Sequence, residues 1–168
     1  IILSNLNLSL TEVEALIHLG SIYLDGKRMQ TNAPVFEGSY IRVHSKPRRF
    51  PKNDYLWSER ILFQNDNFLV VNKPAGLPVH ASVDNLSENL QKYLTDFFHT
   101  EIFVTHRLDI PTSGLLVYAK NRNFLTLFNH LLATRSVQKF YRATTEGMGL
   151  KNGEFIHYME PSPRAPKK

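Results

Sequence analysis

The sequence predicts an α+β protein in which short helices and short strands follow one another along two segments of different character. In two stretches of the second half, apolar residues recur every three or four positions, which indicates amphipathic helices. Short runs rich in branched and aromatic residues end at turn residues such as Asn65, Asp66 and Asn67, which is typical of strands. With 168 residues and 42% apolar content, the chain can bury the core of one domain or two small ones.

Residues 1–45 are predicted to form a small α/β module. Ser9 and Glu12 have the spacing of a capping box, in which each side chain binds the other residue's backbone amide at the start of a helix. Asp25 and Gly26 tolerate the positive φ of a tight hairpin turn. The expected elements are a helix over residues 9–19 and strands over residues 22–24, 27–29 and 40–43.

Residues 46–58 are predicted to be a basic linker, and residues 59–168 a larger domain. The linker is rich in cations and prolines and has little apolar periodicity, so it either follows an RNA backbone or is simply solvated. Its cationic residues are Lys46, Arg48, Arg49 and Lys52. In the larger domain, strands are expected at residues 61–63, 68–71, 102–105, 115–119, 140–145 and 155–158, and helices at 86–97 and 124–132.

The composition favours an anionic partner. The chain has 20 Lys and Arg against 15 Asp and Glu, a net charge of +5 and a pI near 9.5. The absence of cysteine excludes disulfides and cysteine nucleophiles, and the scattered histidines lack the spacing of metal ligands, so neither metal nor cofactor is expected. No apolar run approaches a membrane span, which favours the cytosol or an organelle matrix. The chain begins with Ile1 and is expected to be a fragment at both ends.

The most informative stretch is the polar loop at residues 106–114, between two expected strands. Within four positions, His106, Arg107 and Asp109 supply an imidazole, a guanidinium and a carboxylate, and Pro111 stiffens the following turn. Loops held between buried strands often carry binding and catalytic groups. From the residues alone, an Arg–Asp pair is more often a structural ion pair or a turn anchor than a catalytic site.

Three motifs in this chain resemble those of the RluA-type family of RNA pseudouridine synthases. HRLDIPTSGLLVYAK, at residues 106–120, is similar to the signature that surrounds the family's essential aspartate. VNKPAGLPVH, at residues 71–80, resembles the family's first motif, and Lys139-Phe140-Tyr141 resembles a later one that contains a tyrosine. The resemblance implies a mixed, largely antiparallel sheet that is truncated before a final motif. The N-terminal helix and hairpin resemble a partial small RNA-binding domain of a ribosomal small-subunit protein.

The resemblance also implies the roles of the candidate site residues. Asp109 would be the catalytic group, acting either as a nucleophile or as a base. Arg107 would stack on bases or bind phosphate, and Tyr141 would stack on the extruded uracil. The remaining candidates for substrate binding are His106, Lys73 and His80, of which Lys73 and His80 could contact phosphate.

The predicted function is therefore an RNA pseudouridine synthase that acts on rRNA or tRNA, with no obligate protein partner evident. Two alternatives stay open at this point. One is a noncatalytic RNA-binding protein that retains the synthase fold. The other is a glycoside-cleaving hydrolase, in which Asp109 would work with a second acid such as Asp84 or Glu88.

Overall fold

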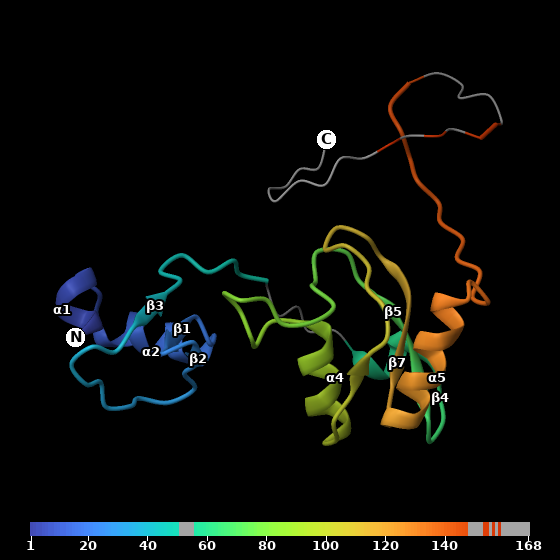
Figure 1. The fold of residues 1–168 in the computed structure, drawn as a ribbon. Helices are drawn as coiled ribbons and strands as arrows, with labels where there is room; N and C mark the ends of the chain where they lie inside the picture. The colour runs from blue at the N-terminus through green and yellow to red at the C-terminus, as the bar shows by residue number, and fades with distance from the viewer. Residues whose placement is uncertain (51–55, 148–152, 155, 157, 159–168) are drawn as a thin grey trace. The chain divides into compact units, whose positions relative to one another are not determined.

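The computed structural model describes residues 1–50, 56–147, 153, 154, 156 and 158 (Figure 1). The chain divides into two compact units, residues 1–137 and 138–168. The helices and strands that follow all belong to the first unit. Among the described residues, no helix is both long enough and apolar enough to cross a membrane.

The N-terminal module begins with two helices, α1 (Ile2–Leu6) and α2 (Leu10–His18), of which only the second was predicted. The predicted capping box of α2 is confirmed. The Ser9 amide donates to Glu12 Oε2 at 2.7 Å, and the Glu12 amide donates to Ser9 Oγ at 3.3 Å. These two bonds satisfy amides that the first turn of a helix leaves unpaired.

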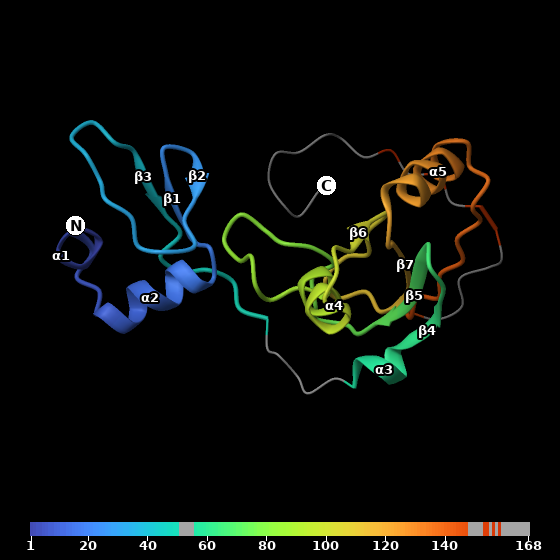
Figure 2. The same ribbon diagram turned by 90° about the horizontal axis from the view of Figure 1, so that it is seen from below.

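A three-stranded antiparallel sheet completes the module, with the strand order β2-β1-β3. Its strands are β1 (Ile22–Leu24), β2 (Lys27–Arg28) and β3 (Ile41–Val43). The hairpin between β1 and β2 turns at Asp25 and Gly26, whose φ angles are +50° and +78°, as the sequence predicts. In Figure 2, α2 runs alongside these strands, and Val13, Leu16 and Ile22 form the small core of the module.

The second sheet has four strands in the order β4-β5-β7-β6, and every pairing is antiparallel, as the family resemblance implies. A short helix, α3 (Trp57–Arg60), precedes it. The strands are β4 (Ile61–Gln64), β5 (Phe68–Lys73), β6 (Phe103–Val104) and β7 (Gly114–Ala119).

Two helices cover opposite faces of this sheet (Figures 1 and 2): α4 (Leu90–Phe98) and α5 (Arg122–Ala133). Side chains alternate between the two faces of a strand. Leu69 and Val71 of β5 therefore lie in the buried core together with Leu90 and Leu94 of α4. Phe68 points to the other face, where its ring stacks on that of Phe124 of α5, with 4.6 Å between the ring centroids.

The pairing of β5 with β7 positions the candidate site. Lys73, the last residue of β5, lies opposite Gly114, the first residue of β7. Because the strands are antiparallel, the loop that follows β5 and the loop that precedes β7 leave the sheet at the same edge. Two of the motifs identified in the sequence, residues 71–80 and 106–120, therefore meet there although residues 81–105 separate them in the chain.

Three expectations about secondary structure need comment. The strand predicted at residues 140–145 is wrong: these residues form no regular element, and Phe140 and Tyr141 are 88% and 67% exposed. A strand needs a hydrogen-bonded neighbour, and none lies beside them in the described part of the chain. Of the strand predicted at 155–158, residues 155 and 157 lie outside the described residues. The helix predicted from Leu86 begins at Leu90, because Asn89 caps it by accepting from the Lys92 amide.

Candidate active site

Asp109 lies on a tight turn at the edge of the second sheet. The amide of Thr112 donates to the Asp109 carbonyl at 3.0 Å, which closes the turn, and the amide of Gly76 donates to the Ile110 carbonyl at 2.7 Å. The second bond ties the turn to the loop that follows β5. The Asp109 residue is exposed, as a reacting group must be.

Asp109 lines a pocket of about 220 Å³. Two of the other residues predicted for the site, Arg107 and His80, line the same pocket. The full lining comprises Arg48, Phe50, Pro78, Val79, His80, Ala81, Ser82, Arg107, Leu108, Asp109 and Ile110. An anionic carboxylate therefore shares one small space with two guanidinium groups and one imidazole.

Lys73 lies beneath this pocket, and its expected contact with phosphate is corrected by the structure. The residue is fully buried, and its ammonium group donates to the carbonyls of Pro74, Leu77 and Ile110 at 3.0, 2.7 and 3.1 Å. An ammonium has three protons to donate, so none is left for a phosphate. Burial lowers the pKa of Lys73 to about 8, and the nearby charge of Asp109 opposes that shift.

The loop after β5 is also anchored from two other directions. The buried hydroxyl of Tyr118 in β7 donates to the Val79 carbonyl at 2.9 Å. The first amides of α4, those of Leu90 and Gln91, donate to the carbonyls of Pro78 and Val79 at 2.9 and 3.0 Å. Burial of the hydroxyl raises the pKa of Tyr118 well above its ordinary value, so it stays a donor.

Arg107 and His80 contact each other across the pocket, with 3.3 Å between Arg107 Nη1 and His80 Nε2. The other ring nitrogen, His80 Nδ1, lies 2.7 Å from the Ala81 carbonyl. A carbonyl can only accept, so Nδ1 donates to it, and Nε2 is the atom that can accept from Arg107. This contact orients the guanidinium. In the described part of the chain Arg107 makes no salt bridge to Asp109.

His106 points away from the pocket. Its Nε2 accepts from the Val117 amide at 3.3 Å. Its ring stacks on that of Phe128 of α5, with 6.2 Å between the ring centroids. These contacts hold the start of the loop against β7 and α5. The structure thus gives His106 an anchoring position, and its predicted contact with substrate finds no support from the lining of the pocket.

Tyr141 belongs to the second compact unit, residues 138–168, and its side chain is exposed. Its predicted contact with the base stays a prediction.

Neither Asp84 nor Glu88, the two acids suggested as the second group of a hydrolase, lines the pocket of Asp109. Asp84 and Glu88 are ion-paired with Arg48 and Arg49. Hydrogen bonds from Arg48 lower the pKa of Asp84 below its ordinary range. Burial alone would raise the pKa of Glu88, but hydrogen bonds from Arg49 and from the Phe50 amide outweigh it and lower that pKa. A general acid has to hold its proton, so these carboxylates are unsuited to the role.

Sequence reasoning missed Arg48 as a pocket residue. It was assigned to a linker that is far from Asp109 in the sequence. It reaches the pocket because residues 48–50 dock on the loop at residues 82–88, where the amides of Arg48 and Phe50 donate to Asp84 and Glu88. No local pattern signals this contact, since it depends on the fold of both segments.

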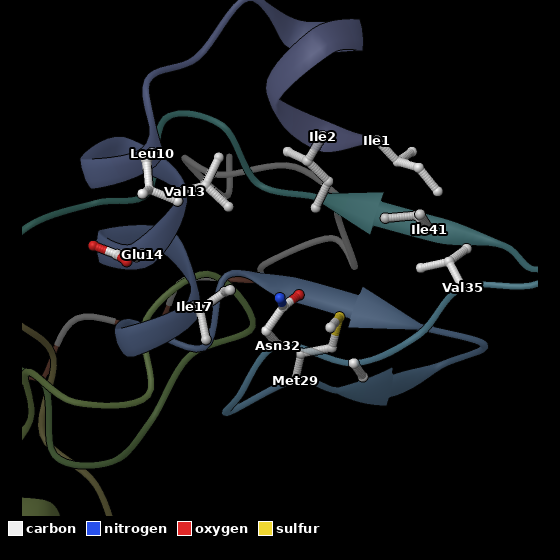
Figure 3. A pocket seen from close by; sticks show the side chains of 11 residues that line it. Ile1, Ile2, Leu10, Val13, Glu14, Ile17, Met29, Asn32, Val35 and Ile41 are labelled. Carbon is white, nitrogen blue, oxygen red and sulfur yellow. The ribbon is translucent and has the colours of Figure 1, made fainter.

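A second pocket, of about 320 Å³, lies inside the N-terminal module (Figure 3). Figure 3 shows that aliphatic side chains of α2, among them Val13 and Ile17, face Met29 and Ile41 across it. It contains none of the residues predicted for the site. We therefore take the pocket around Asp109 as the candidate active site.

Comparison with known proteins connects this geometry to a family. The family model for RNA pseudouridylate synthase matches residues 67–168, which include both loops of the pocket. The chain belongs to this family. The resemblance to RluA-type synthases that the motifs suggested is confirmed.

The relatives include plant and bacterial proteins. RNA pseudouridine synthase 6, chloroplastic, of Oryza sativa subsp. japonica is 32% identical over 77% of this chain and 28% of its own length. A tRNA pseudouridine synthase C of Haemophilus ducreyi is 36% identical over 56% of this chain and 40% of its own. A ribosomal large subunit pseudouridine synthase C of Rickettsia bellii is 29% identical over 89% of this chain and 55% of its own. The chain thus spans between about a quarter and about half of the length of these relatives.

Proposed function

We propose that this protein isomerises uridine in RNA to pseudouridine, with Asp109 as the catalytic carboxylate. The observation that carries the proposal is the exposed Asp109 on a braced turn, in a pocket that it shares with Arg107 and His80. Membership of the RNA pseudouridylate synthase family supports the reaction class.

The reaction needs few groups. The bond between the ribose and N1 of uracil breaks, the base turns, C5 bonds to the same sugar carbon, and the proton on C5 is released while N1 gains one. No oxidation or reduction occurs. One carboxylate can serve, either by attacking the sugar carbon or by removing a sugar proton, and an exposed Asp109 suits both roles.

The neighbouring groups fit an extruded nucleotide. A uridine in folded RNA must leave its stack before its sugar can reach a carboxylate. The planar guanidinium of Arg107, oriented by His80, can stack on bases or bind phosphate. Apolar residues of the pocket, among them Leu108 and Ile110, offer a surface that retains a detached base.

Asp109→Asn is the decisive variant. We expect it to lower the rate of pseudouridine formation by roughly 10³-fold or more, because the amide can neither attack carbon nor accept a proton. The measurement is release of tritium from RNA that carries uridine labelled at C5. Asp66→Asn, at another exposed aspartate outside the pocket, is the matched control and should keep the wild-type rate.

Wild-type turnover that survives Asp109→Asn would reject the role of Asp109. RNA binding without any tritium release by the wild type would instead favour a noncatalytic RNA-binding protein. A release of free uracil would indicate a hydrolase.

We propose rRNA or tRNA as the substrate and the cytosol or an organelle matrix as the compartment. Relatives named for tRNA and for the large ribosomal subunit support the substrate class. Mapping of pseudouridine in RNA from cells with and without the gene identifies the modified position. Fractionation of the same cells locates the protein.

A further inference from the structure

The pocket around Asp109 contains one cation that the family motifs do not include. Arg48 lies outside all three motifs and outside the region that the family model matches, yet it lines the pocket together with Asp109. It approaches from the segment that joins the N-terminal module to the second sheet.

Asp84 holds Arg48 in a fixed orientation. Arg48 Nε donates to Asp84 Oδ2 at 3.1 Å, Nη2 donates to Oδ1 at 2.9 Å, and the Arg48 backbone amide donates to Oδ2 at 2.9 Å. Ser82 donates a further bond to Oδ1 at 2.8 Å. A guanidinium braced in this way loses little side-chain freedom when it binds a ligand.

The ion pair presents its positive partner to solvent. The side chain of Arg48 is 60% exposed, whereas that of Asp84 is 10% exposed. Nη1 of Arg48 has no hydrogen-bond partner among the residues that the structure describes. The guanidinium therefore has free donors at the pocket, while the carboxylate that orients it lies beneath.

We propose that Arg48 binds a backbone phosphate of the RNA next to the nucleotide whose sugar meets Asp109. The inference rests on the proposed function and names a further substrate-binding residue for it. Asp109 repels the phosphates that flank its target, so cations are needed around it. Arginine suits this task because its planar fork matches two oxygens of a phosphate.

Arg49 provides a control within the same segment. Its guanidinium is also held by a carboxylate, with Nη2 donating to Glu88 Oε1 at 2.7 Å, and its side chain is 63% exposed. It lines a different pocket, with residues of α2 and α4, and Asp109 is absent from that lining. If the two arginines only secure the fold, their loss should have equal effects.

The experiment compares Arg48→Gln with Arg49→Gln in the full-length protein. The probes are unmodified tRNA and large-subunit rRNA transcripts, and the readouts are kcat and KM for pseudouridine formation, RNA affinity at several salt concentrations, and Tm. We expect Arg48→Gln to raise KM about tenfold and to reduce the slope of log affinity against log salt by about one. Arg49→Gln should change KM and the salt slope by no more than about twofold. Both variants should lower Tm.

Equal changes in KM and salt slope for the two variants would overturn the proposal, as would a lower Tm for Arg48→Gln with both quantities unchanged. Arg48→Gln leaves Asp84 buried without its partner, so a second variant adds Asp84→Asn to remove that charge. The double variant should reproduce the higher KM and the reduced slope.

The wild type separates this proposal from the proposed function. If the wild type forms no pseudouridine in any transcript, the proposed function fails. The salt slopes of Arg48→Gln and Arg49→Gln on the same transcripts then decide whether Arg48 contacts phosphate.

Discussion

Lys73 shows how a single buried charge can shape the loop that carries Asp109. Its three hydrogen bonds join carbonyls from the loop after β5 to the Ile110 carbonyl, next to Asp109. Three carbonyls that converge repel one another, and the ammonium removes that repulsion. Lys73 therefore holds in place the backbone next to Asp109.

Lys73→Met should lower the free energy of unfolding by about 3 kcal/mol at pH 7, because it leaves three inward-facing carbonyls without a donor. We also expect kcat for pseudouridine formation to fall more than KM changes. Urea unfolding and steady-state kinetics measure the two effects. Lys92→Met, which removes an exposed helical ion pair with Asp96, should change the unfolding free energy by less than about 0.5 kcal/mol.

The lowered pKa of Lys73 predicts that the stability of the protein depends on pH. Burial lowers the pKa of Lys73 in the folded protein to about 8, against 10.5 for the free side chain. Between these pH values the unfolded chain binds one proton more than the folded chain, so the free energy of unfolding rises with pH, by on the order of 3 kcal/mol in total. Lys73→Met should lose this rise in urea unfolding at pH 7.5 to 10. An identical profile for the variant would contradict the assignment.

At the scale of elements, the antiparallel pair β5 and β7 brings both motif loops to one edge of the sheet. Helix α5 packs on the outer face of this pair through Phe124, whose ring stacks on Phe68, and Phe128, which stacks on His106. The helix thereby supports the strand and the start of the loop that carries Asp109.

Phe124→Ala should destabilise the protein by about 2 kcal/mol, since it removes a partly buried stacked ring from the face of the sheet. Leu127→Ala on the same helix is the control. Leu127 is 54% exposed, so its loss should alter the unfolding free energy by less than about 0.5 kcal/mol. Thermal or urea unfolding of both variants checks the difference, and equal losses would show that Phe124 does not support the sheet.

The elements that the sequence predicted well are those set by local rules. The capping box at Ser9 and the Asp25-Gly26 turn depend on residues a few positions apart, and both are confirmed. The hydrogen bond from Lys73 to the Ile110 carbonyl and the approach of Arg48 to Asp109 depend on contacts between distant segments. A lysine at the end of a strand is expected to be exposed, and the three converging carbonyls explain why this one is buried.

At the scale of the whole molecule, one loop joins the N-terminal module to the segment that carries the second sheet. Residues 82–88 accept hydrogen bonds from Ser21, Tyr23 and Arg28 of the module. The same loop holds Arg48 and Arg49 through Asp84 and Glu88. Contacts of the module and the orientation of Arg48 therefore depend on the same loop.

Gly20→Ala tests the packing between the N-terminal module and the loop at residues 82–88. Gly20 has a φ of +65°, and an added Cβ would lie 2.9 Å from the Leu86 Cβ and from Arg28 Cδ. Gly26→Ala is the control, because its φ is +78° but nothing lies within 4 Å of the added atom. Both variants should be destabilised by about 1 kcal/mol from the backbone alone, and Gly20→Ala by about 1 to 3 kcal/mol more from overpacking. Urea unfolding measures the difference in stability between the two variants. Equal stabilities would show that Leu86 and Arg28 shift at little cost to make room for the added Cβ.

The contact between the N-terminal module and residues 82–88 also affects how this sequence can evolve. The atoms that accept from Ser21, Tyr23 and Arg28 are main-chain carbonyls, those of Asp84, Val83 and Ser82. Main-chain oxygens are present whatever the side chain is, so a position such as Val83 can drift in evolution while its bond to Tyr23 survives. Natural variants should therefore carry different residues at Val83. A module transplanted from a relative would still bind this loop, because it binds main-chain carbonyls.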